Sequence, residues 1–198
     1  MNTEFEVLNT SHSALINKFS CAEDNEFLMK LDFNKKARQR IASHNQNIDV
    51  FLKTEALLEQ NKNLNITHLL INKDENELIG FVSLCNDCIP LEIEEKEGYD
   101  FTYGSIPALK IARLAIDTKY QHKGFSQEIF QYAIYQAIKI RENSGLAFMT
   151  LDCYKHRLSF YVSKFGFIKN GIQTNSTAIN PPISMRLHIN KYLDSIAK

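Results

Sequence analysis

The sequence lacks several features that would assign a protein to a familiar class. Lysine plus arginine and aspartate plus glutamate number 23 each, so the 198-residue chain has no formal net charge. Proteins that bind a polyanion over a broad face usually have a basic excess, so the balance disfavours a nucleic-acid-binding protein but leaves a local basic patch open. The chain also has no run of about 18 apolar residues and no signal-peptide-like start. We therefore expect a cytoplasmic protein without a membrane span.

Cysteine is scarce as well. Cys21, Cys85, Cys88 and Cys153 include a single C-x-x-C pair, with no second pair and no histidine cluster nearby. A structural zinc site needs four such ligands, so we expect no metal. We interpret the four residues as ordinary cytosolic thiols, and a redox pair at Cys85 and Cys88 is the alternative.

Internal repeats and low-complexity tracts are absent, and the length suits one domain over residues 1–198. Apolar spacing predicts a helical region from Asp24 to about Gln60, with Phe27, Leu28 and Leu31 among its apolar positions. The polar stretch SHNQN predicts an interruption of that region. The period then changes, and ITHLLIN and ELIGFVSLC predict a β-hairpin with its turn at KDEN.

The rest of the chain alternates between strand-like and helix-like segments. Residues 86–104 are an excursion with an acidic cluster, either a solvated loop or a loop that recognises a cationic substrate. After it we predict, in order, a strand at IPALKIARLAI, a helix with an apolar stripe over residues 129–138, a buried strand at LAFMTLDC, a short helix in HRLSFYVSKFGF and a strand at ISMRLHI. This order predicts an α/β fold with a mixed sheet.

The loop QHKGFS joins the predicted strand to the long helix. A helix N-terminus presents unpaired backbone N–H groups and a partial positive charge, which suit a phosphate. Gly124 would let the chain approach a diphosphate closely, Ser126 is small, and His122 and Lys123 supply donors. The alternative is that Gly124 only eases a tight turn. The loop matches neither G-x-x-x-x-G-K-[ST] nor G-x-G-x-x-G.

Two motifs together carry a family resemblance. The segment RLAIDTKYQHKGFSQEIF resembles the acyl-CoA-binding motif [QR]-x-x-G-x-[GA] of the GNAT superfamily of N-acetyltransferases, with Gln121, Gly124 and Ser126 at its marked positions. Ser126 replaces the usual glycine or alanine. Downstream, RLSFYVSKFGF resembles the superfamily's F-Y-x-x-x-G-F segment, with one extra residue. The departures are Arg157 and Tyr154, where many members have alanine and asparagine.

The resemblance implies a GNAT-like single domain, with a mixed central β-sheet that contains a splayed pair of parallel strands and is flanked by helices. It implies acetyl-CoA as the acyl donor, with no metal. Tyr161 would be the catalytic residue that protonates the departing thiolate, although it could instead be a core aromatic. Backbone groups of one strand would hold the pantetheine arm, and those of the loop would hold the pyrophosphate. The implied cofactor-binding residues are Leu114, Ala115, Ile116, Gln121, His122, Lys123, Gly124, Phe125 and Ser126.

The implied activity is transfer of an acetyl group to a primary amine of a small molecule or protein. The general base stays open among Asp152, Glu128, His68 and the acidic residues of 92–97. KFSCAEDNEFL, KIARLAID and ISMRLHI also resemble the GNAT toxins of bacterial toxin–antitoxin pairs, which acetylate aminoacyl-tRNA. That toxin activity, with tRNA as partner, is one alternative, and a non-catalytic acyl-CoA-binding module is the other. A homodimer is compatible with the sequence.

Overall fold

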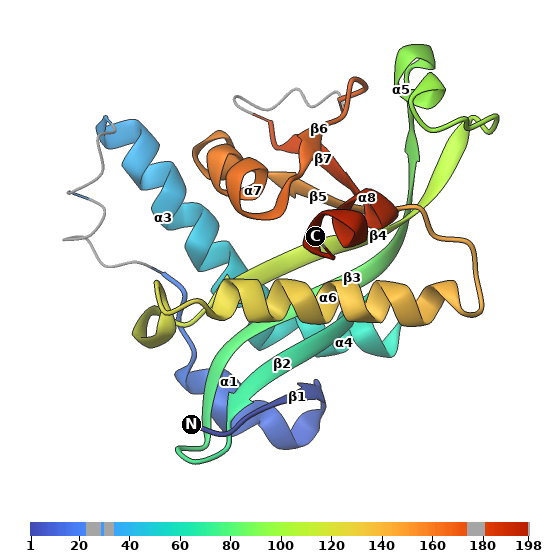
Figure 1. Ribbon diagram of the computed structural model, residues 1–198. Coiled ribbons are helices and arrows are strands. Elements are labelled where there is room, and N and C mark those ends of the chain that lie inside the picture. The colour runs from blue at the N-terminus through green and yellow to red at the C-terminus, as the bar shows by residue number, and fades with distance from the viewer. Residues whose placement is uncertain (23–28, 30–33, 174–180, 198) are drawn as a thin grey trace. The chain divides into compact units, whose positions relative to one another are not determined.

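Seven strands form one mixed sheet in the order β1-β2-β3-β4-β5-β7-β6 (Figure 1). The pair β4–β5 is parallel, whereas β1–β2, β2–β3, β5–β7 and β6–β7 are antiparallel. The predicted α/β fold with a mixed sheet is therefore confirmed. The strands are β1 (Thr3–Val7), β2 (Ile66–Asn72), β3 (Glu77–Pro90), β4 (Ser105–Ile116), β5 (Phe148–Cys153), β6 (Ile168–Lys169) and β7 (Ile183–His188).

The parallel pair is short. Its ladder joins Ala108–Ile111 to Phe148–Leu151. Strand β4 nevertheless continues to Ile116 and β5 to Cys153. Pairing therefore stops before either strand ends, as expected for the splayed parallel pair that the family resemblance implies.

This computed structural model describes residues 1–22, 29, 34–173 and 181–197. They divide into two compact units, which are described separately. Unit 1 comprises residues 1–84 and 113–132, and unit 2 comprises residues 85–112 and 133–198. That residues 1–198 form a single domain stays a prediction. Within the described residues no helix combines the length and the apolar character that crossing a membrane requires.

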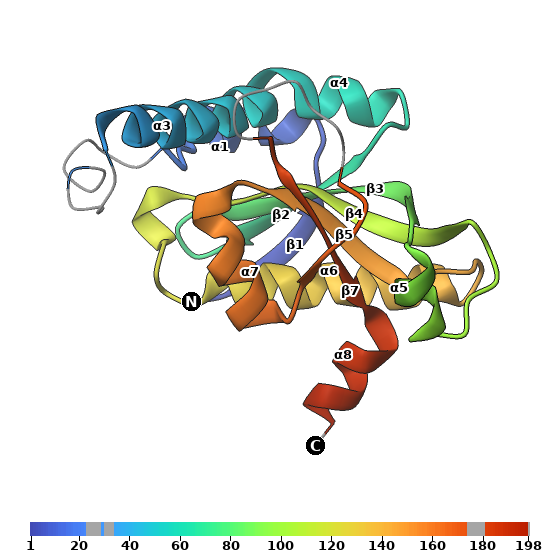
Figure 2. The same cartoon turned by 90° about the horizontal axis from the view of Figure 1, so that it is seen from above.

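In unit 1, helices cover both faces of the antiparallel strands (Figure 2). One face carries α1 (Ser13–Lys18), α3 (Lys35–Val50), a π-helical turn (Phe51–Glu55) and α4 (Ala56–Asn61), and the other carries the first half of α6 (Phe125–Arg141). Burial of apolar surface drives this packing. Members of the core are Leu8, Leu15, Phe19, Phe51, Leu52, Leu69, Phe81 and Ala115.

The predicted interruption of the helical region near SHNQN is wrong. Helix α3 runs through that stretch, and the irregularity is the π-helical turn that follows it. Ile41, Asn45 and Asp49 are buried and recur every fourth residue, so they lie on one inward face. The intervening polar residues lie mostly on the solvent side, where they do not break a helix. The apolar positions predicted between residues 27 and 31 lie outside the described residues.

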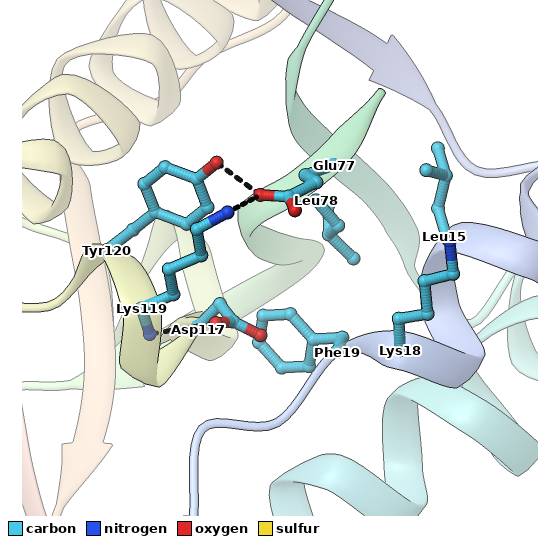
Figure 3. A pocket seen from close by; sticks show the side chains of 8 residues that line it. All are labelled: Leu15, Lys18, Phe19, Glu77, Leu78, Asp117, Lys119 and Tyr120. Atoms are coloured by element: carbon cyan, nitrogen blue, oxygen red, sulfur yellow. Dashed lines mark hydrogen bonds and ion pairs between the residues drawn. The ribbon is translucent and has the colours of Figure 1, made fainter. Parts of the chain in front are cut away.

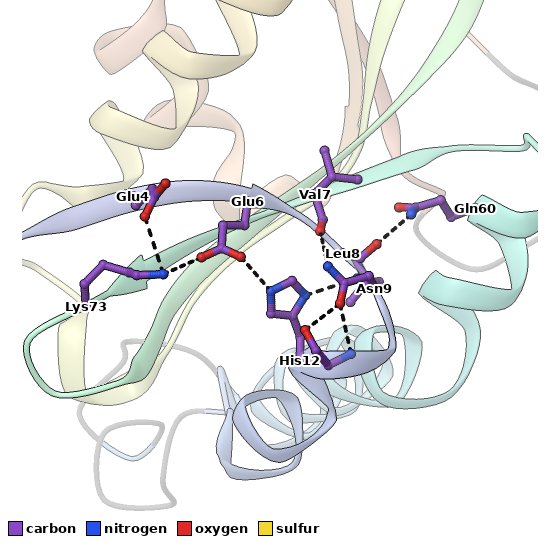
Figure 4. A network of polar contacts seen from close by, with 9 residues as sticks. Glu4, Glu6, Val7, Leu8, Asn9, His12, Gln60 and Lys73 are labelled. Carbon is purple, nitrogen blue, oxygen red and sulfur yellow. Dashed lines mark hydrogen bonds and ion pairs between the residues drawn. The ribbon is translucent and has the colours of Figure 1, made fainter.

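The sequence analysis did not predict strand β1, which is tied down by polar contacts (Figure 4). The Glu6 carboxylate accepts a hydrogen bond from Lys73 Nζ at 2.5 Å and pairs with His12 Nε2 at 3.0 Å. The backbone N–H of Asn9 donates a hydrogen bond to Nδ1 of His12 at 3.1 Å. The hydrogen bonds from Lys73 and His12 lower the pKa of Glu6. This network attaches the strand to the helical turn that follows it.

In unit 2 the helices are α5 (Ile93–Glu97), the second half of α6, α7 (Leu158–Phe165) and α8 (Ile189–Ile196). The excursion at residues 86–104 is more ordered than a solvated loop. Strand β3 extends to Pro90, and α5 begins after two intervening residues. Glu95 pairs with the buried Arg186 at 2.5 Å and accepts a hydrogen bond from the amide of Gly171. At least one of the acidic residues is therefore structural.

Candidate acyl-CoA site

The QHKGFS loop leaves the short helical turn Thr118–Tyr120 and enters α6 at Phe125. Its backbone is unusual, because His122 has φ 61° and Gly124 has φ 92°. Residues with positive φ on either side of Lys123 curve the backbone, so that successive N–H groups point toward the same place. Backbone with this geometry binds anions. The first turn of the 17-residue helix α6 adds N–H groups without intrahelical partners and the positive end of its dipole.

Gly124 tests whether a phosphate fits this loop. No heavy atom lies within 4 Å of the position that a Cβ on Gly124 would occupy. The positive φ alone agrees with the turn-only interpretation, since glycine adopts it without strain. The open space in front of the backbone is a separate observation, and it is what close approach of a ligand requires. The loop therefore leaves room for a diphosphate in front of Gly124.

The side chain of Gln121 does not reach into that space. Its Nε2 donates hydrogen bonds to the carbonyl of Ile116 at 3.1 Å and to that of Cys21 at 3.4 Å. The side chain therefore ties the loop to the end of β4 and to the segment after α1. Any contact of Gln121 with a phosphate would come from its backbone.

A buried carboxylate supports the same segment, and sequence reasoning missed it. Asp49 of α3 accepts hydrogen bonds from Ser20 Oγ and from the amide of Cys21, both at 2.8 Å. The amide of Ser20 donates to Asp117 Oδ2 at 2.9 Å, and the Ser20 carbonyl accepts from the amide of Thr118. Ser20 and Asp117 are 97 positions apart, so no local pattern in the sequence reveals the contact.

The end of β4 lies very close to β3. A Cβ on Gly80 would lie 2.6 Å from the carbonyl oxygen of Ala115, so this oxygen faces β3. Backbone groups of successive residues in a strand point to opposite edges. Those of Leu114 and Ile116 therefore point to the other edge, where the Ile116 carbonyl accepts the hydrogen bond from Gln121.

The other loop residues divide between surface and core. His122 and Lys123 are exposed, and Lys123 Nζ lies 5.5 Å from the ring centroid of Tyr120. The Phe125 side chain is buried and packs edge-on against Tyr120, with ring centroids 5.8 Å apart. Ser126 is half-buried in the first turn of α6. Phe125 thus offers a ligand its backbone only.

Tyr161 belongs to unit 2 and lies on α7. Its ring packs against Phe165 and Phe167, with centroids 6.2 and 6.0 Å away. Burial raises the pKa of its hydroxyl to about 12, so the group keeps its proton at neutral pH. Among the described residues none makes a hydrogen bond to this hydroxyl. Gly166, with φ 75°, ends the helix. Tyr161 therefore combines a core-packed ring with a proton that a ligand can accept.

Three of the candidate bases have other partners. His68 is buried, which lowers its pKa to about 4, and its Nδ1 lies 3.0 Å from the hydroxyl of Tyr132. Glu128 accepts a hydrogen bond from Thr3 Oγ1 at 3.2 Å. Asp152 pairs with Lys110 Nζ at 2.6 Å.

Unit 1 also holds a small pocket beside the loop (Figure 3). Its volume is about 110 Å³, and Glu77, Asp117, Lys119 and Tyr120 line its polar part. The Glu77 carboxylate accepts hydrogen bonds from Lys119 Nζ at 2.5 Å and from the Tyr120 hydroxyl at 2.6 Å. Ligand pockets are usually several times larger. These groups also satisfy one another, so we do not assign the pocket a ligand.

Comparison with protein-family models finds no match for the chain, and comparison with curated proteins finds none either. Solved structures do match over the whole chain. A tyrosine-to-phenylalanine mutant of KacT has a TM-score of 0.73 at 16% identity, covering 98% of this chain and 99% of that one. AtaT complexed with acetyl-methionyl-tRNA has a TM-score of 0.72 at 16% identity, covering all of both chains.

A third match is a tyrosine-to-phenylalanine mutant of the AtaT toxin bound to the C-terminus of the antitoxin AtaR and acetyl-CoA. It has a TM-score of 0.65 at 15% identity and covers all of both chains. The GNAT fold predicted from the two motifs is therefore confirmed.

Proposed function

We propose that the protein is an N-acetyltransferase that uses acetyl-CoA as its acyl donor. The observation that carries the proposal is the open space in front of Gly124, in a loop whose backbone bends at His122 and Gly124 before α6 begins. The whole-chain likeness to an AtaT mutant bound to acetyl-CoA supports it.

The roles of the cofactor-binding residues follow from their positions. Backbone amides of Gln121–Ser126 bind the pyrophosphate, with His122 and Lys123 adding donors at the surface. The backbone of Leu114 and Ile116 pairs with the pantetheine arm, and one of those amides polarises the thioester carbonyl. Ala115 keeps β4 against Gly80 of β3.

Acetyl-CoA supplies an acetyl group activated as a thioester. The neutral acceptor amine attacks the carbonyl carbon, so a C–N bond forms as the C–S bond breaks. Tyr161 donates its proton to the departing sulfur, and the proton that the nitrogen loses restores the Tyr161 hydroxyl through solvent. The products are an acetamide and the free thiol, and no redox change occurs.

We further propose that the acceptor is the α-amino group of an aminoacyl-tRNA rather than a small-molecule or protein amine. The likeness to AtaT complexed with acetyl-methionyl-tRNA supports this choice. An ordinary α-amino group has a pKa of about 8 and a lysine side chain about 10.4, so the α-amino group is far more often neutral at physiological pH. An α-amino acceptor therefore needs no strong base. This fits the structure, in which the candidate bases His68, Glu128 and Asp152 are bonded to other residues.

Four basic residues close together at the start of α3 also favour this acceptor. Lys35, Lys36, Arg38 and Arg40 lie within the first six residues of the helix, whose first turn has no acidic residue. Cations at a helix N-terminus oppose the dipole and cost stability. Four cations gathered at the start of α3, in a chain without net charge, would favour binding to the phosphate backbone of a tRNA.

Location and assembly complete the proposal. We propose that the protein is cytoplasmic, as the sequence leads us to expect. A homodimer and the single-domain organisation stay predictions.

Transfer of a radiolabelled acetyl group tests the acceptor. Total tRNA charged with the amino acids should take the label, whereas deacylated tRNA, spermidine and a lysine-containing peptide should not.

The double variant Lys35→Gln, Lys36→Gln should bind tRNA more weakly. The slope of its log binding constant against log salt concentration should also fall by about one unit for each phosphate that the lysines no longer neutralise. Lys53→Gln with Lys62→Gln, exposed in the same unit, is the matched control. Label on the small amines alone would refute the tRNA acceptor, and no coenzyme A release with any amine would indicate a non-catalytic module.

A further inference from the structure

Tyr120, the residue just before the QHKGFS loop, is buried in a turn whose other residues are not. It is 5% exposed, whereas Thr118 and Lys119 are exposed. A short turn has little apolar surface of its own, so residues from elsewhere must hold a ring that it buries. The hydroxyl and the ring of Tyr120 have separate partners, all of which belong to unit 1.

The hydroxyl of Tyr120 anchors the turn to the β2–β3 hairpin. It donates a hydrogen bond to the Glu77 carboxylate at 2.6 Å (Figure 3). It also accepts one from Asn72 Nδ2 at 3.3 Å. Asn72 is the last residue of β2 and Glu77 is the first of β3. Burial and the hydrogen bond to Glu77 raise the pKa of Tyr120 to about 12, so the hydroxyl keeps the proton that it donates. The residue that leads into the loop is therefore fixed to the sheet.

The ring of Tyr120 contacts two ammonium groups and one aromatic side chain. Lys119 Nζ and Lys123 Nζ each lie 5.5 Å from the ring centroid, within the range of a cation–π attraction. Phe125 meets the ring edge-on, with centroids 5.8 Å apart. Lys123 and Phe125 both belong to the loop. Tyr120 therefore contacts an exposed cation and a buried ring of the loop that follows it.

The two lysines beside this ring differ in how their charges are balanced. Lys119 Nζ donates a hydrogen bond to Glu77 at 2.5 Å and lies 3.4 Å from Glu75 Oε2. The hydrogen bond to Glu77 raises the pKa of Lys119, which therefore stays charged within this ion pair. Lys123 is exposed, and within the part of the chain that the structure describes no carboxylate pairs with its ammonium group. The charge of Lys123 is thus available to an anionic ligand.

Lys123 also lies where the loop bends. It is between His122 and Gly124, the two residues with positive φ that turn the backbone amides toward the same place. An anion bound by those amides would lie close to the base of the Lys123 side chain. A long flexible side chain loses rotamer freedom when it binds such an anion. Contact with the Tyr120 ring already restricts the Lys123 side chain, and so reduces the entropy that is lost on binding.

We propose that Tyr120 is a positioning residue for the diphosphate of the cofactor and that it acts through Lys123. This role rests on the proposed function of the protein as an enzyme that binds acetyl-CoA. The buried hydroxyl fixes the ring to the hairpin, and the ring holds the Lys123 ammonium group beside the loop. Glu75 and Glu77 are occupied by Lys119 and do not neutralise Lys123. The backbone amides bind the diphosphate, and Lys123 supplies the positive charge that neutral amides lack.

Isothermal titration with acetyl-CoA at low and at high salt tests the contribution of Lys123. Lys123→Gln should raise the Kd about fivefold at low salt, because one exposed ion pair is lost. The difference from wild type should shrink at high salt, which screens the charge. Lys123→Arg keeps the charge and stacks on aromatic rings, so its Kd should stay within about twofold of wild type. The matched control is Lys139→Gln, which removes a lysine 5.0 Å from the ring of Tyr135, outside the loop.

Two ring variants test whether Tyr120 acts through Lys123. Tyr120→Phe and a pentafluorinated phenylalanine at position 120 have nearly the same shape, but fluorination removes the attraction between the ring face and a cation. At low salt the fluorinated ring should raise the Kd about threefold relative to Tyr120→Phe. In the Lys123→Gln background it should have no effect, because the cation is gone.

Equal losses from fluorination in both backgrounds, or no loss in either, would overturn the proposal and leave Tyr120 a structural residue only. A Lys123→Gln variant that binds acetyl-CoA as tightly as wild type at low salt would also overturn it. Failure of wild type to bind acetyl-CoA would instead remove the proposed function itself.

Discussion

The buried carboxylate of Asp49 allows a stability effect to be worked out from its contacts. It is 9% exposed and accepts hydrogen bonds from Ser20 Oγ and from the amide of Cys21, each at 2.8 Å. Hydrogen bonds to charged groups contribute about 1.5–3 kcal/mol each. Asp49→Ala also leaves the buried Cys21 amide without a partner. We expect it to lower the free energy of unfolding by about 3–5 kcal/mol, and Asp49→Asn, which keeps one acceptor oxygen, to lower it by about half as much.

Urea denaturation measures this change, and calorimetry should show a lower Tm, by about 2–4 °C for each kcal/mol. Ser20 and Cys21 also contact Asp117 and Gln121, so the folded variant should bind acetyl-CoA about tenfold more weakly. The exposed Asp74, changed to alanine, is the control. A loss of less than about 0.5 kcal/mol for Asp49→Ala, typical of an exposed site, would refute the reasoning.

Three further predictions rest on single contacts. Gly80→Ala should lower the free energy of unfolding by about 2 kcal/mol in urea, because the new Cβ would lie 2.6 Å from the Ala115 carbonyl oxygen; an unchanged midpoint would contradict this. Tyr161→Phe should reduce kcat about a hundredfold or more with little change in the Kd for acetyl-CoA, measured by coenzyme A release and calorimetry; equal kcat would make Tyr161 a core residue only. His68, whose buried ring has its pKa lowered to about 4, binds a proton more readily when unfolded, so the protein should lose up to about 3 kcal/mol as the pH falls from 7 to 4. In urea denaturation, the free energy of unfolding of His68→Gln should fall by about that much less between pH 7 and pH 4. Identical pH profiles for wild type and variant would exclude His68 as the source of the effect.

Strong local patterns made most of the sheet and the long helix predictable. The hairpin at β2 and β3, the strand β4 and the helix α6 all follow from periodicity and turn residues. Strand β1 was missed because its acidic sequence, TEFEV, gains its strand character from pairing with β2. The false break in α3 came from treating polar residues as helix breakers, although polar residues on a solvent face leave a helix intact.

The candidate site was predictable only where chemistry is local. The QHKGFS loop carries its own signal, a glycine and small residues ahead of a helix. No local sequence pattern predicts that Asp49 holds the segment next to this loop, because the contact joins residues far apart in the sequence. The alternation of Thr150 and Asp152 in an otherwise apolar strand was a visible sign of polar side chains on one face, and the interpretation of LAFMTLDC as a continuous apolar strand missed it.

Isothermal titration with acetyl-CoA, comparing wild type, Gly124→Ala and Gly124→Asp, tests the central claim most directly. Gly104→Asp, a glycine with equally open space outside the loop, is the charge control. Our account predicts binding by wild type and the control, weaker binding by Gly124→Ala because of the φ of 92°, and none by Gly124→Asp, whose carboxylate would occupy and repel the phosphate site. Equal binding by wild type and Gly124→Asp, or no binding by wild type, would contradict it.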